Sequence, residues 1–176
     1  MAVRPKDPLL AAGKIVTTLV SALLLLVAVV LVITIPALLF SYKHVAQALD
    51  GNAANLPLVL TAIAGLLALG AAVMAAAFKF FRYLGKIIDT VGQGDPFVNE
   101  NANRLEKMGW IAAAFQVAAI PMMVAVAYLQ TQFPDQDIRL DIELSPTGIL
   151  LAIVLFILAR VFRQGSAMRD ELEGTV

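Results

Sequence analysis

The sequence predicts an all-α integral membrane protein, a bundle of four transmembrane helices, and three observations support this fold class. Of its 176 residues, 60% are hydrophobic and only 15% are charged, whereas soluble domains have roughly 45–50% apolar and about 25% charged residues. Charged residues are missing from four long intervals, and the basic residues gather in every second connection between those intervals. Together these observations predict four spans with both termini in the cytoplasm.

The uncharged intervals locate the spans. They cover residues 15–42, 51–78, 108–134 and 144–159. About 20 helical residues cross the ~30 Å hydrocarbon core of a bilayer, so the first three intervals are long enough. The fourth is short, but Arg160 and Arg163 can extend it by burying their aliphatic stems. We therefore predict one membrane domain, residues 1–176, with spans at about 15–40, 57–81, 108–130 and 146–163.

The segment between the second and third spans is predicted to form a cytoplasmic hairpin over residues 82–107. The helical pattern of the second span continues past Phe78, with charged residues at spacings of three or four up to Asp89. A helix over 57–91 would be about 52 Å long at 1.5 Å per residue, which exceeds the thickness of the hydrocarbon core. Gly92-Gln93-Gly94-Asp95-Pro96 then predicts a turn. It lacks the Lys-Ser/Thr of a Walker phosphate-binding loop.

Small and amide side chains predict contacts between helices. Four alanines at four-residue spacing would let another backbone approach closely, as small-xxx-small packing requires: Ala64, Ala68, Ala72 and Ala76. Gln116, inside the third span, should find a hydrogen-bond partner on another helix. Asn99 or Asn101 is a candidate cap for that span.

The connection between the third and fourth spans alternates charged and apolar residues over 137–144, which predicts a short extracytoplasmic β-like segment. This unpaired segment and the alanine stripe make a homodimer a candidate assembly. Ser145-Pro146 should cap and start the fourth helix. The acidic residues Asp135, Asp137 and Asp141 could bind a hard cation, but we favour a solvated face. The only histidine, His44, lacks an acidic residue at helical ligand spacing.

The orientation follows from the positive-inside rule. Eleven of the 13 Lys and Arg residues lie in the N-terminal segment, the central hairpin and the C-terminal segment, and only Lys43 and Arg139 lie in the two other connections. The termini and the hairpin are therefore expected in the cytoplasm, with a cytoplasmic tail over residues 164–176.

The chemistry of the sequence favours a non-enzyme without cofactor or metal. There is no cysteine, so a thiolate nucleophile and a cysteine zinc site are excluded. No Ser/His/Asp set and no HExxH motif is found, and none of the four spans contains an acidic residue. Ion-coupled transporters usually need such intramembrane groups, so this absence argues against them.

Two stretches, GDPFVNENANRLEKMGW (94–110) and LARVFRQGSAMRDELEGTV (158–176), resemble the signature of the domain-of-unknown-function 2975 family of small bacterial membrane proteins. The shared features are a GDPF turn, an ENA-RL helix start, a Val-Phe-x-x-Gly helix end and an acidic tail ending in Thr-Val. The resemblance extends over the whole chain in length and helix number, and it implies that the protein is located in the bacterial inner membrane. Members are commonly encoded beside a small helix-turn-helix regulator, which implies a cytoplasmic protein partner.

Our leading hypothesis from these patterns is a membrane-embedded partner that binds or sequesters a transcriptional regulator without itself binding nucleic acid. The candidate partner-binding residues are Arg82, Lys86, Asp95, Asn99, Glu100, Asn101, Arg104, Arg163, Arg169, Asp170 and Glu171. The alternative is a structural role, in which Gly94, Asp95 and Pro96 only form the turn. Asp95 or Glu100 could also pair with Arg163 and connect the hairpin to the tail as a structural clamp. Two other functions stay open: a carrier or channel for a small hydrophobic or cationic compound near Gln116 and Pro121, and a structural, lipid-organising protein.

Overall fold

Four long α-helices make up the computed structural model, which describes residues 8–40, 56–134 and 142–173. The helices are α1 (Pro8–Phe40), α3 (Leu56–Gly92), α4 (Asn99–Gln132) and α5 (Pro146–Glu173). Each is long and apolar enough to cross a membrane. The described residues contain no strand, and the chain has the make-up of a multi-pass membrane protein. Every predicted span falls within one of these helices.

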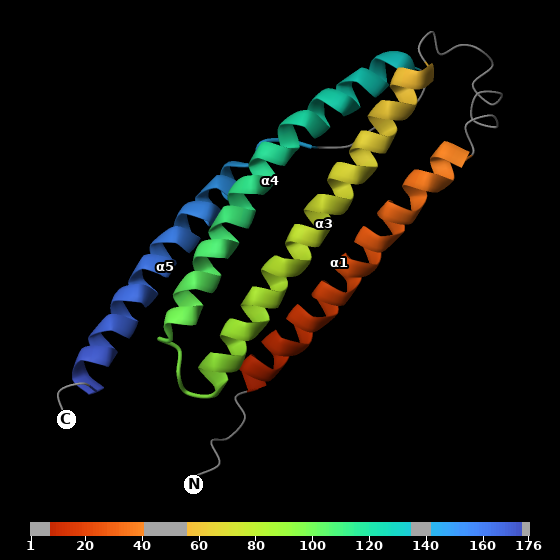
Figure 1. The fold of residues 1–176 in the computed structure, drawn as a ribbon. Coiled ribbons are helices and arrows are strands. Elements are labelled where there is room, and N and C mark those ends of the chain that lie inside the picture. The colour runs from red at the N-terminus through yellow and green to blue at the C-terminus, as the bar shows by residue number, and fades with distance from the viewer. Residues whose placement is uncertain (1–7, 41–55, 135–141, 174–176) are drawn as a thin grey trace.

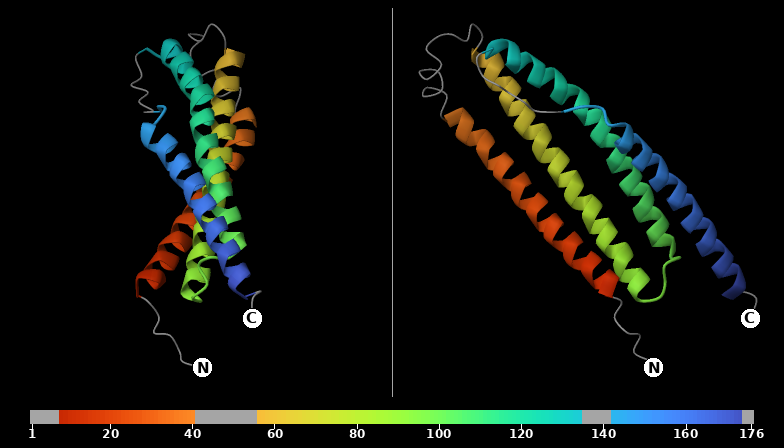
Figure 2. Two further views of the ribbon diagram at one scale, coloured as in Figure 1. Left: turned by 90° about the vertical axis from the view of Figure 1, so that its left-hand side faces the viewer. Right: turned by 180° about the vertical axis from the view of Figure 1, so that it is seen from behind.

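The helices lie side by side in chain order, as a row (Figure 1). α1 packs on α3, α3 on α4, and α4 on α5, so α1 and α5 occupy the two edges. In the side view of Figure 2, α1 and α5 incline in opposite directions. The sequence predicted a bundle, whereas the structure is an open row. In lipid this is stable because an apolar helix face loses little by facing acyl chains instead of another helix.

One end of the row, here called the hairpin end, contains the N-terminal end of α1, the turn between α3 and α4, and the C-terminal end of α5 (Figure 1). α3 is one uninterrupted helix of 37 residues, about 55 Å long at 1.5 Å per residue. α5 likewise continues without a break to Glu173, so most of the predicted tail is helical. These extensions place the family-like stretches next to one another.

α1 and α3 pack along an antiparallel seam, and glycines of α3 face α1 in it. A Cβ added at Gly85 would lie 3.5 Å from the Thr17 hydroxyl oxygen, and one added at Gly70 would lie 3.5 Å from Leu31. Ala68 and Ala72, by contrast, are exposed. Ala64 and Ala76 are partly buried, so the close helix approach expected of the alanine stripe stays a prediction.

α4 and α5 enclose most of the apolar core, to which α3 adds Ile87. The core residues are Ile87, Leu105, Met108, Ala112, Ala152, Leu155 and Ala159. Trp110 packs edge-to-face against Phe156 with ring centroids 5.3 Å apart. A Cβ at Gly109 would approach the Phe156 ring to 2.9 Å, so this close helix contact requires glycine.

The start of α5 confirms two expectations. The Gln116 side-chain oxygen accepts a hydrogen bond from the Ser145 N–H at 3.0 Å, which joins α4 to the first turn of α5. Ser145 in turn accepts from the Gly148 N–H through its hydroxyl, at 3.4 Å, and Pro146 is the first helical residue. In the predicted β-like segment, residues 142–144 form neither helix nor strand and residues 137–141 lie outside the described part. His44, Asp135, Asp137 and Asp141 also lie outside it.

Candidate functional site at the hairpin end

The turn between α3 and α4 is closed by its own backbone. Gly94 has φ 85°, a left-handed conformation that glycine adopts without steric cost. The Gly94 N–H donates to the carbonyl of Val91 at 3.0 Å and the Asp95 N–H to that of Thr90 at 3.0 Å. Together these bonds end α3 and lead the chain into Pro96, as the Gly-Asp-Pro sequence predicts.

Asn101 is fully buried beneath this turn and holds it in place. Its side-chain amide donates to the Thr90 hydroxyl at 2.7 Å and to the Pro96 carbonyl at 2.9 Å. Its oxygen accepts from the Arg104 guanidinium at 2.6 Å. The expectation that an asparagine caps α4 is wrong, because the N-cap residue is Val98 and no side chain caps it. Asn101 contacts the turn from the interior of the protein. The prediction that its side chain belongs to an exposed partner-binding surface is therefore wrong as well.

Phe97 fastens the turn to α5. Its ring lies 5.2 Å, between centroids, from that of Phe162. It also covers Gly165, where an added Cβ would come within 2.7 Å of the Phe97 ring. The Phe of the GDPF turn thus packs on the Phe and Gly of the Val-Phe-x-x-Gly stretch. The sequence analysis did not select Phe97, because an apolar residue in a turn gave no chemical signal.

Ion pairs reinforce this junction. Asp95 pairs with Arg169, and Arg163 pairs with Glu106 at 2.7 Å and donates to the Asn103 amide oxygen at 3.3 Å. A clamp between hairpin and tail was expected, but the partners differ: Asp95 binds Arg169, and Arg163 binds residues one helical turn or more into α4. All of these side chains are more than one third exposed, so each pair contributes little stability, about 0.2–1 kcal/mol.

The two family-like stretches therefore bind one another. Of the eleven candidate partner-binding residues, Asn101 is buried, and Asp95, Arg104, Arg163 and Arg169 are engaged within the chain. The other six are exposed at or near the hairpin end: Arg82, Lys86, Asn99, Glu100, Asp170 and Glu171. Among the described residues there is no group of three or more His, Asp or Glu that could hold a metal ion.

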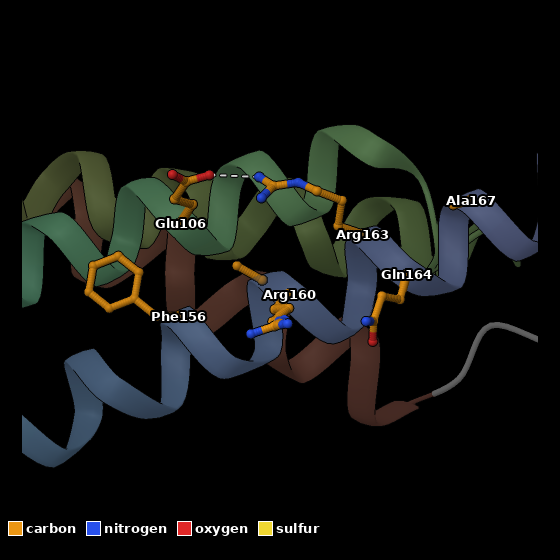
Figure 3. Close-up of a pocket in the computed structure, with 7 residues that line it drawn as sticks. Glu106, Phe156, Arg160, Arg163, Gln164 and Ala167 are labelled. Atoms are coloured by element: carbon orange, nitrogen blue, oxygen red, sulfur yellow. Dashed lines mark hydrogen bonds and ion pairs between the residues drawn. The ribbon is translucent and has the colours of Figure 1, made fainter.

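Two clefts open between the helices of the hairpin end. The first lies between α4 and α5 and has a volume of about 520 Å³. In Figure 3, Glu106 and Arg163 reach toward one another across it, while Arg160 and Gln164 point away from this pair. Within the described residues the Arg160 guanidinium has no carboxylate partner. Because Glu106 offsets Arg163, this cleft has one basic group in excess.

The second cleft, of about 270 Å³, lies between α1 and α3. Lys14 pairs with Asp89 across it at 2.6 Å. Its remaining lining is three hydroxyl side chains of α1 and, on α3, Phe81, Arg82, Gly85 and Lys86. The sequence analysis assigned Arg82 and Lys86 to a partner-binding surface, and the structure places both beside this cleft.

The comparison with protein families identifies the chain. The family described as protein of unknown function (DUF2975) matches residues 41–176. The chain belongs to this family. The DUF2975 match covers α3, α4 and α5 and begins after α1 ends, whereas the resemblance seen in the sequence extended over the whole chain. Neither a curated protein nor a solved structure matches significantly.

Proposed function

We propose that this DUF2975 protein is a non-enzymatic, inner-membrane partner that binds a cytoplasmic helix-turn-helix regulator and holds it away from DNA. The supporting observation is a preorganised junction of hairpin and tail that leaves acidic side chains exposed around it. We call these the acidic rim: Glu100 at the start of α4, and Asp170 and Glu171 near the end of α5.

The charge of the rim suits this kind of partner. DNA-binding proteins contact phosphates through Lys and Arg side chains. The hairpin end as a whole has more basic than acidic residues, so the contact with the regulator is confined to the acidic rim, where the carboxylates can bind basic side chains of the partner and compete with DNA for them. The Asp95–Arg169 pair and the Phe97–Phe162 packing hold the two helix ends that carry the rim, so the protein does not have to order this surface on binding.

Co-purification tests the proposal. The full-length protein, extracted in neutral detergent, should retain a small helix-turn-helix regulator of the kind that the family resemblance implies beside its gene, and should weaken the regulator's binding to DNA. The double variant Glu100→Gln with Asp170→Asn should bind the regulator roughly three- to tenfold more weakly, because rim charges contribute modestly. Glu143→Gln, an exposed carboxylate at the opposite end, is the control and should bind as the wild type does. Unchanged solubility and DNA binding of the regulator in the presence of the wild-type protein would refute the proposal.

Orientation is a separate requirement, and the absence of cysteine allows a clean test of it. Asn101 is unsuitable for labelling because it is buried, but Glu100 and Glu143 are exposed at opposite ends. In spheroplasts, a membrane-impermeant maleimide should modify Glu143→Cys, and Glu100→Cys only after the membrane is permeabilised. The reverse pattern would place the acidic rim outside the cell, where no transcriptional regulator could reach it.

A carrier function gains no comparable support. Its candidate polar residue, Gln116, already binds the Ser145 N–H and lies against Gly148. A compound in transit would have to break this contact, which joins α4 to α5. We therefore favour protein binding over transport.

A further inference from the structure

The cleft between α1 and α3 combines polar walls, a position at the end of an apolar stretch and basic groups that have no carboxylate partner in the part of the chain that the structure describes. We propose that it binds the phosphate headgroup of an anionic glycerophospholipid. This inference is independent of the regulator proposal and of which end faces the cytoplasm.

The charges of the cleft favour an anion. Lys14, Arg82 and Lys86 line it together with a single carboxylate, Asp89. Lys14 and Asp89 neutralise one another. Among the described residues, neither the Arg82 guanidinium nor the Lys86 ammonium has a carboxylate partner, and Arg82 only lies over the Phe78 ring at 5.8 Å. The cleft thus has two basic groups in excess, one helical turn apart on the same face of α3.

The depth of the cleft favours a lipid over a soluble anion. Lys14 directly precedes the uncharged interval 15–42 of α1, and Lys79 and Arg82 follow the uncharged interval 51–78 of α3. Basic groups at this boundary lie at the level of the headgroups, where basic pockets between transmembrane helices bind anionic lipids. Ile15 and Leu19, on the same turns of α1, are 61% and 65% exposed. Of these two, Ile15 lies one helical turn from Thr18 of the cleft and offers acyl chains an apolar surface beside it.

The hydroxyl groups of the cleft favour a headgroup with its own donors. The hydroxyls of Thr17, Thr18 and Ser21 donate to carbonyls of α1, at 2.9, 2.7 and 2.9 Å. Thr17 and Ser21 are buried, but Thr18 is exposed, and its oxygen keeps a lone pair that can accept. A glycerol headgroup can donate to the Thr18 oxygen while its phosphate binds Arg82 and Lys86. Phosphatidylglycerol is therefore the preferred probe.

Native mass spectrometry of the full-length protein in neutral detergent tests the proposal by titration. Phosphatidylglycerol, phosphatidylcholine and inorganic phosphate form separate arms. Phosphatidylglycerol should bind in a saturable way and at least tenfold more tightly than phosphatidylcholine. The variant Arg82→Gln/Lys86→Gln should lose roughly thirtyfold in affinity, since each basic group near a membrane surface contributes about 1 kcal/mol to anionic-lipid binding.

The matched control is Lys79→Gln/Lys107→Gln, which removes the same charge from exposed positions at a similar height but outside the cleft. It should keep the wild-type affinity. Arg82→Lys/Lys86→Arg keeps both charges and should retain most of the binding, which separates a charge effect from misfolding. Equal affinity for the two lipids would overturn the proposal, as would an equal loss in the control. Tight binding of inorganic phosphate alone would assign the cleft to a soluble anion and overturn the lipid assignment.

Discussion

The two outer helix pairs of the row, α4–α5 and α1–α3, differ in how many of their charged side chains form ion pairs at the hairpin end. Between α4 and α5, the charged side chains of the family-like stretches pair with one another, as Arg163 does with Glu106 and Asp95 with Arg169. Between α1 and α3, only Lys14 finds a carboxylate, and Arg82 and Lys86 remain without one among the described residues. The first region pairs four charged side chains and leaves Arg160 without a carboxylate partner in the described part of the chain, whereas the second pairs only Lys14 with Asp89 and leaves both Arg82 and Lys86 without one.

This difference changes the roles that we give to the charged residues. From the sequence alone, residues of the family-like stretches were assigned to a partner-binding surface. The conspicuous residues of the GDPF and Val-Phe-x-x-Gly stretches build the junction of hairpin and tail. The residues that line the cleft between α1 and α3 are less distinctive lysine and arginine side chains, and α1 itself lies outside the family match. Conspicuous spacing in a sequence can therefore mark an internal contact as readily as a binding site.

The largest effect we expect comes from the junction itself. Asn101→Leu keeps the branching of the side chain but removes the bonds to the Pro96 carbonyl and to the Arg104 guanidinium, which keeps only a 3.5 Å bond to the Lys86 carbonyl. Leaving a buried polar group unsatisfied costs about 1–3 kcal/mol, and Arg104 can recover part of its loss by turning to water. The variant should lose about 3 kcal/mol of unfolding free energy, measured by denaturation in neutral detergent.

Asn103→Leu is the control two residues away. Asn103 is exposed and makes a single long hydrogen bond, at 3.3 Å, to Arg163. Its substitution should change the unfolding free energy by less than about 0.5 kcal/mol. Equal losses in the two variants would mean that the buried network does not hold the junction. If Asn101→Leu also left lipid binding at the α1–α3 cleft intact, the two regions would be separable in function as well.

The helices could be predicted from the sequence, and their arrangement could not. Uncharged intervals between basic segments mark spans because a charge in the hydrocarbon core is costly. The sequence does not indicate that α1 and α5 lie at the edges of the row, because an apolar helix face can contact either lipid or a neighbouring helix. The start of α1 at Pro8, before Lys14, was missed for a related reason: a lysine at the interface does not end a helix.

The site was predicted in part. Gly94 and Asp95 were correctly assigned to a turn, since few residues other than glycine favour a positive φ. Asn101 was assigned to the surface because it lies in a family-like stretch on the predicted cytoplasmic side, whereas three hydrogen bonds make its burial favourable. The cleft between α1 and α3 was missed because Lys14 and Lys86 are far apart in the sequence, and only the packing of α1 on α3 brings them together.

The smallest effect we expect comes from the ion pairs of the two regions. Lys14–Asp89 and Asp95–Arg169 are each more than one third exposed on both sides, so solvent screens them and each should contribute below about 1 kcal/mol. Double-mutant cycles with Lys14→Gln/Asp89→Asn and Asp95→Asn/Arg169→Gln should give similar coupling free energies that fall as salt is raised. A coupling above about 2 kcal/mol for Asp95–Arg169 alone would mean that charge, and not the packing of Phe97 on Phe162 and Gly165, fastens the hairpin to the tail. In that case the junction would open at high salt, and the acidic rim would lose its fixed geometry under the same conditions.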